Sequence, residues 1–190
     1  MEGNIKYKID KHKDLVDACA KNDGRAQLKI YDLYYKAMYN ASLRIVNDTF
    51  LAEDIMQDSF IDAFGKLDTF EWRSSFGSWL KRIVINKSLD SLRSKVDLVS
   101  LTEETTEIPD EDYSDFENVD CKIEEIKVAL KLLPENNRII LALHLFEGYD
   151  HQEIAHILDI SYNNVRVRYI RAKRKLLEKI SANKSQQVLN

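Results

Sequence analysis

Seven basic side chains lie between residues 166 and 179 of this 190-residue chain, with Glu178 as the single acid among them. Arginine can donate two hydrogen bonds to one guanine edge, and lysine pairs well with phosphate oxygens. A helix that carries both residue types therefore suits the major groove of duplex DNA. A run of charge by itself more often marks a solvated helix surface, so the interpretation depends on the apolar residues around it.

The apolar residues of segment 150–180 have the spacing of two short, packed helices. The second helix carries apolar residues at i, i+4, i+7 and i+11, which form one stripe, and Ser161 before it is a good N-cap. The stripe consists of Val165, Tyr169, Ala172 and Leu176, and the inner side of the first helix consists of Ile154, Ala155 and Leu158. Asp159 occupies the turn, where a left-handed residue is expected and Asp is tolerated. The pattern predicts a helix-turn-helix that binds DNA.

Aromatic and basic residues are interleaved in segment 66–95. Unpaired bases stack on aromatic rings while Lys and Arg follow the phosphates, so this composition favours single-stranded DNA or a flipped base. Phe76 and Trp79 have helical spacing, and we interpret them as core residues. Trp72 and Arg73 lie in an expected loop, where no such spacing explains them. The basic members of the segment are Lys66, Arg73, Lys81, Arg82, Lys87, Arg93 and Lys95.

Asp54, Asp58 and Asp62 recur at i, i+4 and i+8 of an expected helix and form one acidic face. Their spacing does not supply the further ligands that a metal ion needs. No nucleophile or histidine lies beside them for acid–base chemistry. Two interpretations stay open, a face that docks a protein partner and a face that is merely solvated.

The histidines and the rest of the sequence indicate no enzyme. His144, His151 and His156 are separated by seven and five residues, so they do not repeat on one helical face. No cysteine or carboxylate completes a known ligand pattern around them. Because the sequence also lacks a phosphate-binding loop and a nucleophile–base pair, we expect no catalytic residue, no metal site and no cofactor.

Helices account for nearly all of the expected structure. Glycine and proline are scarce, at five and two residues, which argues against a β-sandwich or barrel. Helical spacing covers residues 14–46, which are interrupted by a break at 22–24. It also covers 51–64, 76–93, 123–133, 135–147 and 151–180, and residues 66–75 are expected to form a loop.

Charge divides the chain into three segments. Residues 1–96 carry a net +2, residues 97–120 hold ten acids and no Lys or Arg, and residues 121–190 carry a net +4. We therefore predict an all-α protein with two small helical domains, 1–96 and 121–190, joined by an acidic flexible linker, 97–120. The helix-turn-helix belongs to the C-terminal domain. DNA responds to local charge, so the overall charge of −4 does not argue against nucleic acid.

The sequence contains no segment with the length and apolar character of a membrane span, and no secretory signal. Its two cysteines, Cys19 and Cys121, do not form a disulfide framework. We expect a cytoplasmic protein without direct membrane insertion.

Two sets of motifs resemble conserved regions of the extracytoplasmic-function sigma factors of the sigma-70 family. The stretches from Ala52 to Phe60 and from Phe76 to Asn86 look like region two. The motifs that look like region four are Leu133-Pro134, Glu147-Gly148-Tyr149, Glu153-Ile154-Ala155, Val165-Arg166-Val167-Arg168 and Arg171-Ala172. The resemblance covers nearly all of the chain from residue 14 to residue 180.

The resemblance implies a factor that binds core RNA polymerase, recognises and melts promoter DNA, and initiates transcription. Region two is then expected to dock on the polymerase through Asp54, Gln57 and Asp58. The residues expected at the −10 element are Lys66, Trp72, Arg73, Lys81, Arg82 and Asn86, of which Asn86 stands where the family often contacts a flipped base. The residues expected at the −35 element are Arg166, Val167, Arg168, Ile170, Arg171, Arg174 and Lys175.

The resemblance also implies an anti-sigma factor as a partner, because such a protein commonly holds the family inactive. An alternative function is a helix-turn-helix transcriptional regulator that acts without the polymerase-docking role. It predicts a dimer seam, for which we find no strong heptad pattern. An adaptor that only sequesters partners would leave the arginines of 166–174 unexplained.

Overall fold

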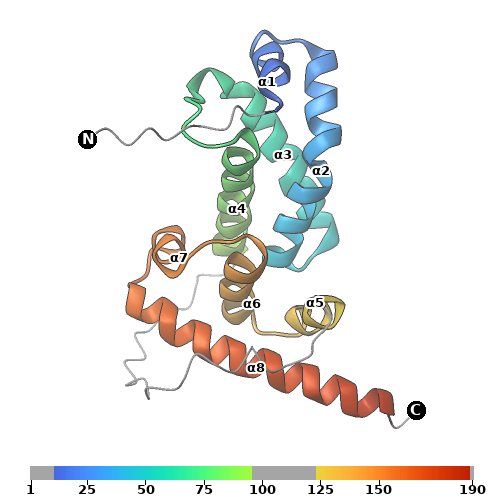
Figure 1. The fold of residues 1–190 in the computed structure, drawn as a ribbon, viewed down its shortest axis with the longest axis vertical. Helices are drawn as coiled ribbons and strands as arrows, with labels where there is room; N and C mark the ends of the chain where they lie inside the picture. The colour runs from blue at the N-terminus through green and yellow to red at the C-terminus, as the bar shows by residue number, and fades with distance from the viewer. Residues whose placement is uncertain (1–10, 96–122, 189–190) are drawn as a thin grey trace. The chain divides into compact units, whose positions relative to one another are not determined.

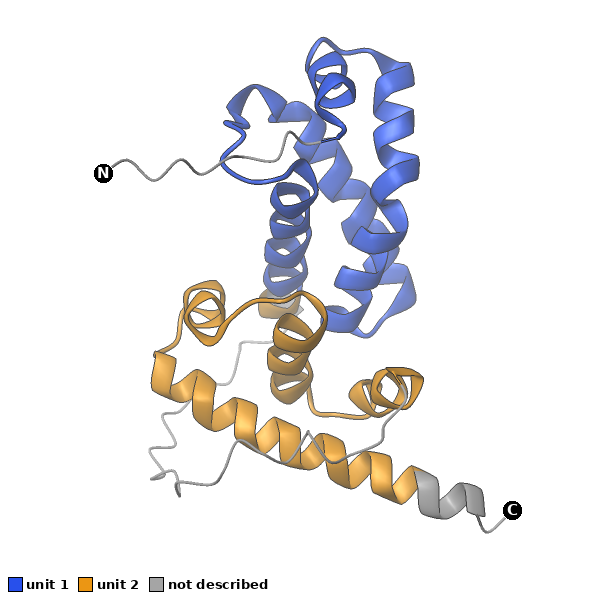
Figure 2. Ribbon diagram, viewed as in Figure 1, with its two compact units in different colours: residues 1–91 blue, residues 92–190 orange. Residues whose placement is uncertain are grey.

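Every regular element in the described part of the chain is a helix (Figure 1). The computed structural model describes residues 11–95 and 123–188, and the chain divides into two compact units, residues 1–91 and 92–190 (Figure 2). The predicted all-α fold with two helical domains is confirmed. The acidic linker predicted for 97–120 lies outside the described residues, and the domain limits predicted at its two ends stay predictions.

Unit 1 is a helical bundle (Figure 1). Its elements are α1 (Lys13–Ala20), α2 (Gly24–Val46), α3 (Thr49–Gly65), the 3-10 helix η1 (Leu67–Thr69) and α4 (Phe76–Lys95). The breaks fall where predicted, since Asn22 and Asn47 have left-handed φ angles of 60° and 54°. Asp23 and Asp48 then cap α2 and α3 with their side chains. The loop predicted for 66–75 contains one short helical turn, η1, that the sequence pattern did not indicate.

The core of unit 1 joins α2 to α4. Ile30 of α2 and Phe76 of α4 are both fully buried. Two buried hydroxyls lie within this apolar core: Ser88 Oγ is 3.0 Å from Ser42 Oγ and donates to the Val84 carbonyl at 2.8 Å. Because these buried polar groups are satisfied, α4 is held against α2 at Ser88 without an energetic penalty.

Cys19 lies on the inner side of α1 and is buried. Burial, reinforced by the negative charge of Asp23, raises the pKa of its thiol to about 11. The thiol therefore stays protonated at neutral pH and acts as a small core residue.

Unit 2 packs three short α-helices against one long helix (Figure 1). Its elements are α5 (Ile123–Lys131), α6 (Glu135–Leu141), the π-helical turn η3 (Ala142–Phe146), α7 (His151–Leu158) and α8 (Tyr162–Val188). The single helix predicted for 135–147 is instead α6 followed by η3, where the Glu147 amide donates to the Ala142 carbonyl five residues earlier, at 3.2 Å. Gly148, with φ of 81°, ends this segment as predicted.

No helix within residues 11–95 or 123–188 combines the length and the apolar character that crossing a bilayer requires.

Candidate nucleic-acid interface

Side-chain caps begin both α7 and α8, and a left-handed residue makes the turn between them. Asp150 begins α7 with a capping box: its carboxylate accepts from the Glu153 amide at 2.8 Å, and the Glu153 carboxylate accepts from the Asp150 amide at 2.8 Å. Asp159 ends α7 in the left-handed conformation, with φ of 55°, as predicted. Ser161 Oγ accepts from the Asn164 amide at 3.2 Å and caps α8. The predicted helix-turn-helix is thus present.

A buried stripe orients α8 about its axis. Val165, Ala172 and Leu176 are fully buried, and Tyr169 is nearly so. These are the four residues that the helical spacing predicted. Because the stripe faces the core, the side chains between its members point sideways or outward.

The seven residues predicted for the −35 element differ in exposure according to their place beside this stripe. Three are exposed: Arg171, Arg174 and Lys175. Four are half-buried: Arg166, Val167, Arg168 and Ile170. Burial lowers the pKa of Arg168 and the nearby charge of Arg171 adds to this, but a guanidinium keeps its proton at any physiological pH. The outward positive charge of α8 is therefore concentrated from Arg171 onward.

A His–Tyr cluster packs beneath the first turns of α8. The rings of His144 and His151 lie 5.0 Å apart, and they lie 4.7 and 4.8 Å from the ring of Tyr169. His144 Nδ1 is 2.9 Å from the Tyr149 carbonyl oxygen, so in the neutral ring Nδ1 carries the proton. Burial lowers the pKa of His151, and the charges of His144 and Arg166 lower it further. At neutral pH His151 therefore packs as an uncharged ring.

In unit 1, four aromatic rings form one cluster. The Phe70 ring lies 4.7 Å from the Trp72 ring, 4.9 Å from the Trp79 ring and 6.0 Å from the Phe76 ring. Phe76 is fully buried, which confirms it as a core residue, whereas Trp72 and Trp79 are half-buried. Trp72 has a left-handed φ of 56°, which is uncommon for a bulky residue, and Lys13 Nζ lies 5.7 Å from its ring centroid. The cluster therefore presents partly accessible aromatic surface beside the start of α4.

The six residues predicted for the −10 element come from the end of α3, the following loop and α4. Four are exposed: Lys66, Arg73, Arg82 and Asn86. Two are half-buried: Trp72 and Lys81. Arg82 and Asn86 are one helical turn apart and share a face of α4. Arg73 is paired with Glu71, with an N···O distance of 2.6 Å, and both side chains are well exposed.

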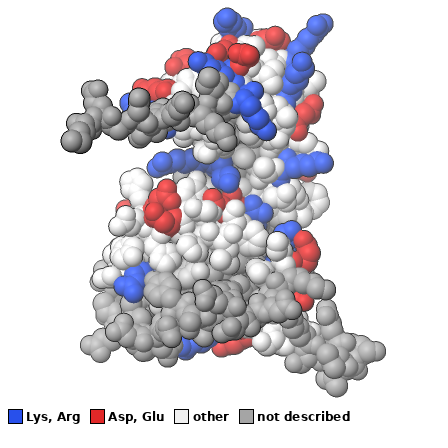
Figure 3. All heavy atoms as spheres, viewed as in Figure 1, with Lys and Arg blue, Asp and Glu red and all other residues white. Residues whose placement is uncertain are grey.

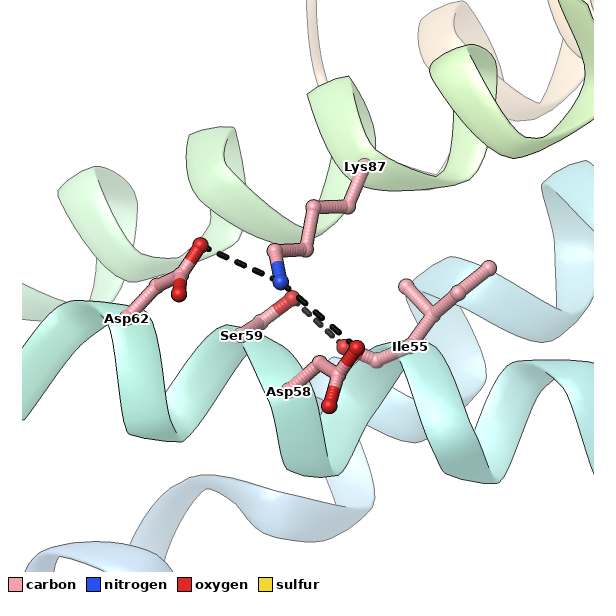
Figure 4. Close-up of polar contacts among 5 residues, drawn as sticks. All are labelled: Ile55, Asp58, Ser59, Asp62 and Lys87. Carbon is pink, nitrogen blue, oxygen red and sulfur yellow. Dashed lines mark hydrogen bonds and ion pairs between the residues drawn. The ribbon is translucent and has the colours of Figure 1, made fainter. Parts of the chain in front are cut away.

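The acidic face of α3 is exposed where docking was predicted, at Asp54, Gln57 and Asp58. Lys87, which the sequence analysis counts among the basic residues around the aromatics, also lies at this face. Lys87 Nζ of α4 lies 3.1 Å from Asp62 Oδ2 and 3.7 Å from Asp58 Oδ2 (Figure 4). The acidic face of α3 is therefore partly neutralised from within unit 1.

Positive and negative side chains are mixed on the surface of the molecule. On the face shown in Figure 3, Lys and Arg side chains are intermixed with Asp and Glu side chains. Among the described residues, no group of three or more His, Cys, Asp or Glu side chains is placed to hold a metal ion.

Two segments of the chain match known families. Residues 30–96 match Sigma-70 region 2, and residues 123–176 match Sigma-70, region 4. The matches fall in the two segments where the motifs carry the resemblance described above, in the same order.

Known relatives are similar over most of their length. The RNA polymerase sigma-H factor of Pseudomonas aeruginosa is 30% identical over 86% of this chain and 91% of its own. The ECF RNA polymerase sigma factor SigW of Bacillus subtilis is 29% identical over 95% of this chain and 98% of its own. A chain in the co-crystal structure of the sigma factor RpoE with the anti-sigma factor NepR, from Bartonella quintana, superposes with a TM-score of 0.55 at 23% identity, covering 80% of this chain and 95% of that chain. This last likeness concerns the fold alone.

Proposed function

The chain belongs to the extracytoplasmic-function sigma factors of the sigma-70 family, and from this premise we propose which of its residues carry the family's work. As a member, it directs core RNA polymerase to promoters and initiates transcription. Sigma factors are non-enzymatic subunits of the polymerase, so the prediction that the chain is not an enzyme is confirmed. Membership also removes the alternative of a regulator that acts without the polymerase.

We propose that α8 reads the −35 element in the major groove. The observation that carries this assignment is the combination of the left-handed turn at Asp159 with the buried stripe of α8, because together they direct the basic side chains away from the core. Arg171 is exposed and suits a guanine edge, and Arg166, Val167, Arg168 and Ile170 line the adjoining half-buried side. Arg174 and Lys175, also exposed, suit the phosphate backbone.

For the −10 element we propose the aromatic cluster and the exposed face of α4. Trp72 offers ring surface for stacking, and Asn86 offers an amide that can both donate to and accept from a base edge. Lys66, Arg73, Lys81 and Arg82 supply positive charge along the strand. The exposed acids of α3, Asp54 and Asp58, with Gln57 between them, form the proposed polymerase-docking face.

We also propose an anti-sigma factor as a partner and the cytoplasm as the place of action. The RpoE protein that shares this fold was crystallised with an anti-sigma factor, which supports the first proposal. The second follows from the location of the polymerase that the family serves.

Transcription in vitro with purified core RNA polymerase, with and without the full chain, tests this function on a pool of genomic promoters. We expect new, discrete start sites that share two upstream elements. Asn86→Ala should reduce opening at these promoters by about 1–3 kcal/mol in apparent free energy, the range for base-edge contacts. Asn40→Ala, an exposed helix asparagine of α2, is the matched control and should change nothing. Equal activity of both variants would contradict the assignment of Asn86.

A further inference from the structure

Lys87 joins the helix proposed to dock on the polymerase to the helix proposed to read the −10 element. It follows Asn86 on α4, and its neighbour Ser88 is buried and packed against Ser42 of α2. The backbone at Lys87 is therefore fixed, and only a rotation of its side chain can change which carboxylate it contacts. That side chain is 30% exposed and reaches across to α3.

The two carboxylates within reach of Lys87 are not equivalent. The 3.1 Å distance to Asp62 is that of a charge-assisted hydrogen bond, whereas the 3.7 Å distance to Asp58 leaves only a Coulomb attraction. The Asp62 side chain is 37% exposed and the Asp58 side chain is 68% exposed. Asp62 is therefore the main partner of the ammonium group, and Asp58 remains largely in water.

A buried line on the inner side of α3 keeps the two acids on one edge of the helix. Ser59 is buried, and its hydroxyl donates to the Ile55 carbonyl at 2.6 Å, on the inner side of the helix (Figure 4). Asp58 and Asp62 lie one turn apart beside this buried line, so both carboxylates stay within reach of Lys87.

We propose that Asp62 is a positioning residue for the polymerase-docking face: it holds Lys87 so that Asp58 stays open to a cationic group of the polymerase. This inference rests on the proposed docking role of α3. Without Asp62, Lys87 has Asp58 as its remaining carboxylate partner in Figure 4 and becomes an internal competitor for it. The Asp62–Lys87 pair also keeps α3 and α4 linked when Asp58 binds the cationic group of the polymerase.

A double-mutant cycle measured on the full chain tests the proposal, with fluorescence anisotropy of binding to purified core polymerase as the readout. We expect Asp62→Asn to weaken binding about two- to fivefold, the range for exposed ion pairs. Lys87→Met should bind as tightly as the wild type or slightly more tightly, because it frees both acids. The double variant should bind like Lys87→Met alone. Asp62→Glu, which keeps the negative charge, should retain wild-type affinity.

Asp32→Asn is the matched control, because it removes one exposed negative charge from α2 in the same unit. It should leave the affinity unchanged, and tryptophan fluorescence should show every variant folded. A loss in Asp62→Asn that persists in the Lys87→Met background would overturn the proposal, since Asp62 would then contact the polymerase directly. No loss in Asp62→Asn would overturn it as well. Failure of Asp58→Asn and Asp54→Asn to weaken binding would instead refute the docking role of α3 itself.

Discussion

The two units place their candidate DNA-binding residues in different ways. In unit 2 these residues lie on one helix, and a buried stripe with a left-handed turn at Asp159 sets their direction. In unit 1 they come from a loop and a helix around an aromatic cluster, in which Trp72 itself has a left-handed backbone. The comparison indicates that recognition and stability are separable in unit 2 but share the same aromatic residues in unit 1.

The largest effect should come from the fully buried ring of the aromatic cluster. Phe76→Ala removes a fully buried ring and should destabilise unit 1 by about 3–5 kcal/mol. Both tryptophans of the chain, Trp72 and Trp79, lie in unit 1, so urea unfolding followed by tryptophan fluorescence reports on this unit. The matched control is Phe50→Ala, at a residue 82% exposed, which should stay within about 0.5 kcal/mol of the wild type. Equal free energies of unfolding for the two variants would show that the cluster does not stabilise unit 1.

In unit 2, Arg171→Ala should cost recognition without costing stability. We expect it to weaken −35-dependent promoter binding by the holoenzyme by about 1–3 kcal/mol and to relax the preference for one base pair. Lys175→Ala, at an exposed position one turn further along α8, should weaken binding to all sequences alike and reduce its salt dependence. Binding measured on a set of −35 variants at two salt concentrations separates the two. A sequence-selective loss in Lys175→Ala would contradict its placement on phosphate.

The turn at Asp159 should be sensitive to the shape of its side chain. Asp159→Val places a β-branched residue at a φ of 55° and should destabilise unit 2 by about 1–2 kcal/mol. Asp159→Gly, which suits this backbone, should be neutral or stabilising. Urea unfolding followed by NMR amide signals of α8 measures both. Equal stability of the two variants would show that the backbone of the turn differs from the one described.

The smallest effect should be a pH dependence of unit 2. The pKa of His151 is lowered in the folded chain, so the unfolded chain binds its proton more readily. The contribution of His151 to the stability of unit 2 should therefore be fully present above the ordinary histidine pKa of about 6.5. It should be lost as the pH drops below that value. His151→Gln should flatten this part of the profile in the same NMR experiment. An unchanged slope in the variant would assign the effect to another group.

Local patterns in the sequence were sufficient to predict most of unit 2. The stripe from Val165 to Leu176 and the turn at Asp159 depend on residues close together in the chain, and periodicity detects such relations. The π-helical turn η3 was not predicted, because one extra residue per turn leaves the apolar pattern of 135–147 nearly unchanged.

Long-range relations account for what the sequence did not predict in unit 1. Lys87 appeared as one more basic residue near the aromatics, and only the packing of α4 beside α3 brings it to Asp62. No helical spacing explains Trp72 in the sequence, and the bend that brings its ring to Phe70 depends on a backbone conformation that its residue type disfavours.

The buried thiol of Cys19 offers a chemical probe for the opening of unit 1. Its pKa is raised to about 11 and its side chain is buried on the inner side of α1, so we expect it to react with an alkylating reagent at neutral pH only while the short helix is detached. The alkylation rate of Cys19 therefore reports how often α1 detaches. It detects openings that are too rare to change a spectroscopic signal averaged over all molecules. Compared with and without core polymerase, that rate would reveal whether the amino-terminal edge of the bundle tightens when the factor is engaged.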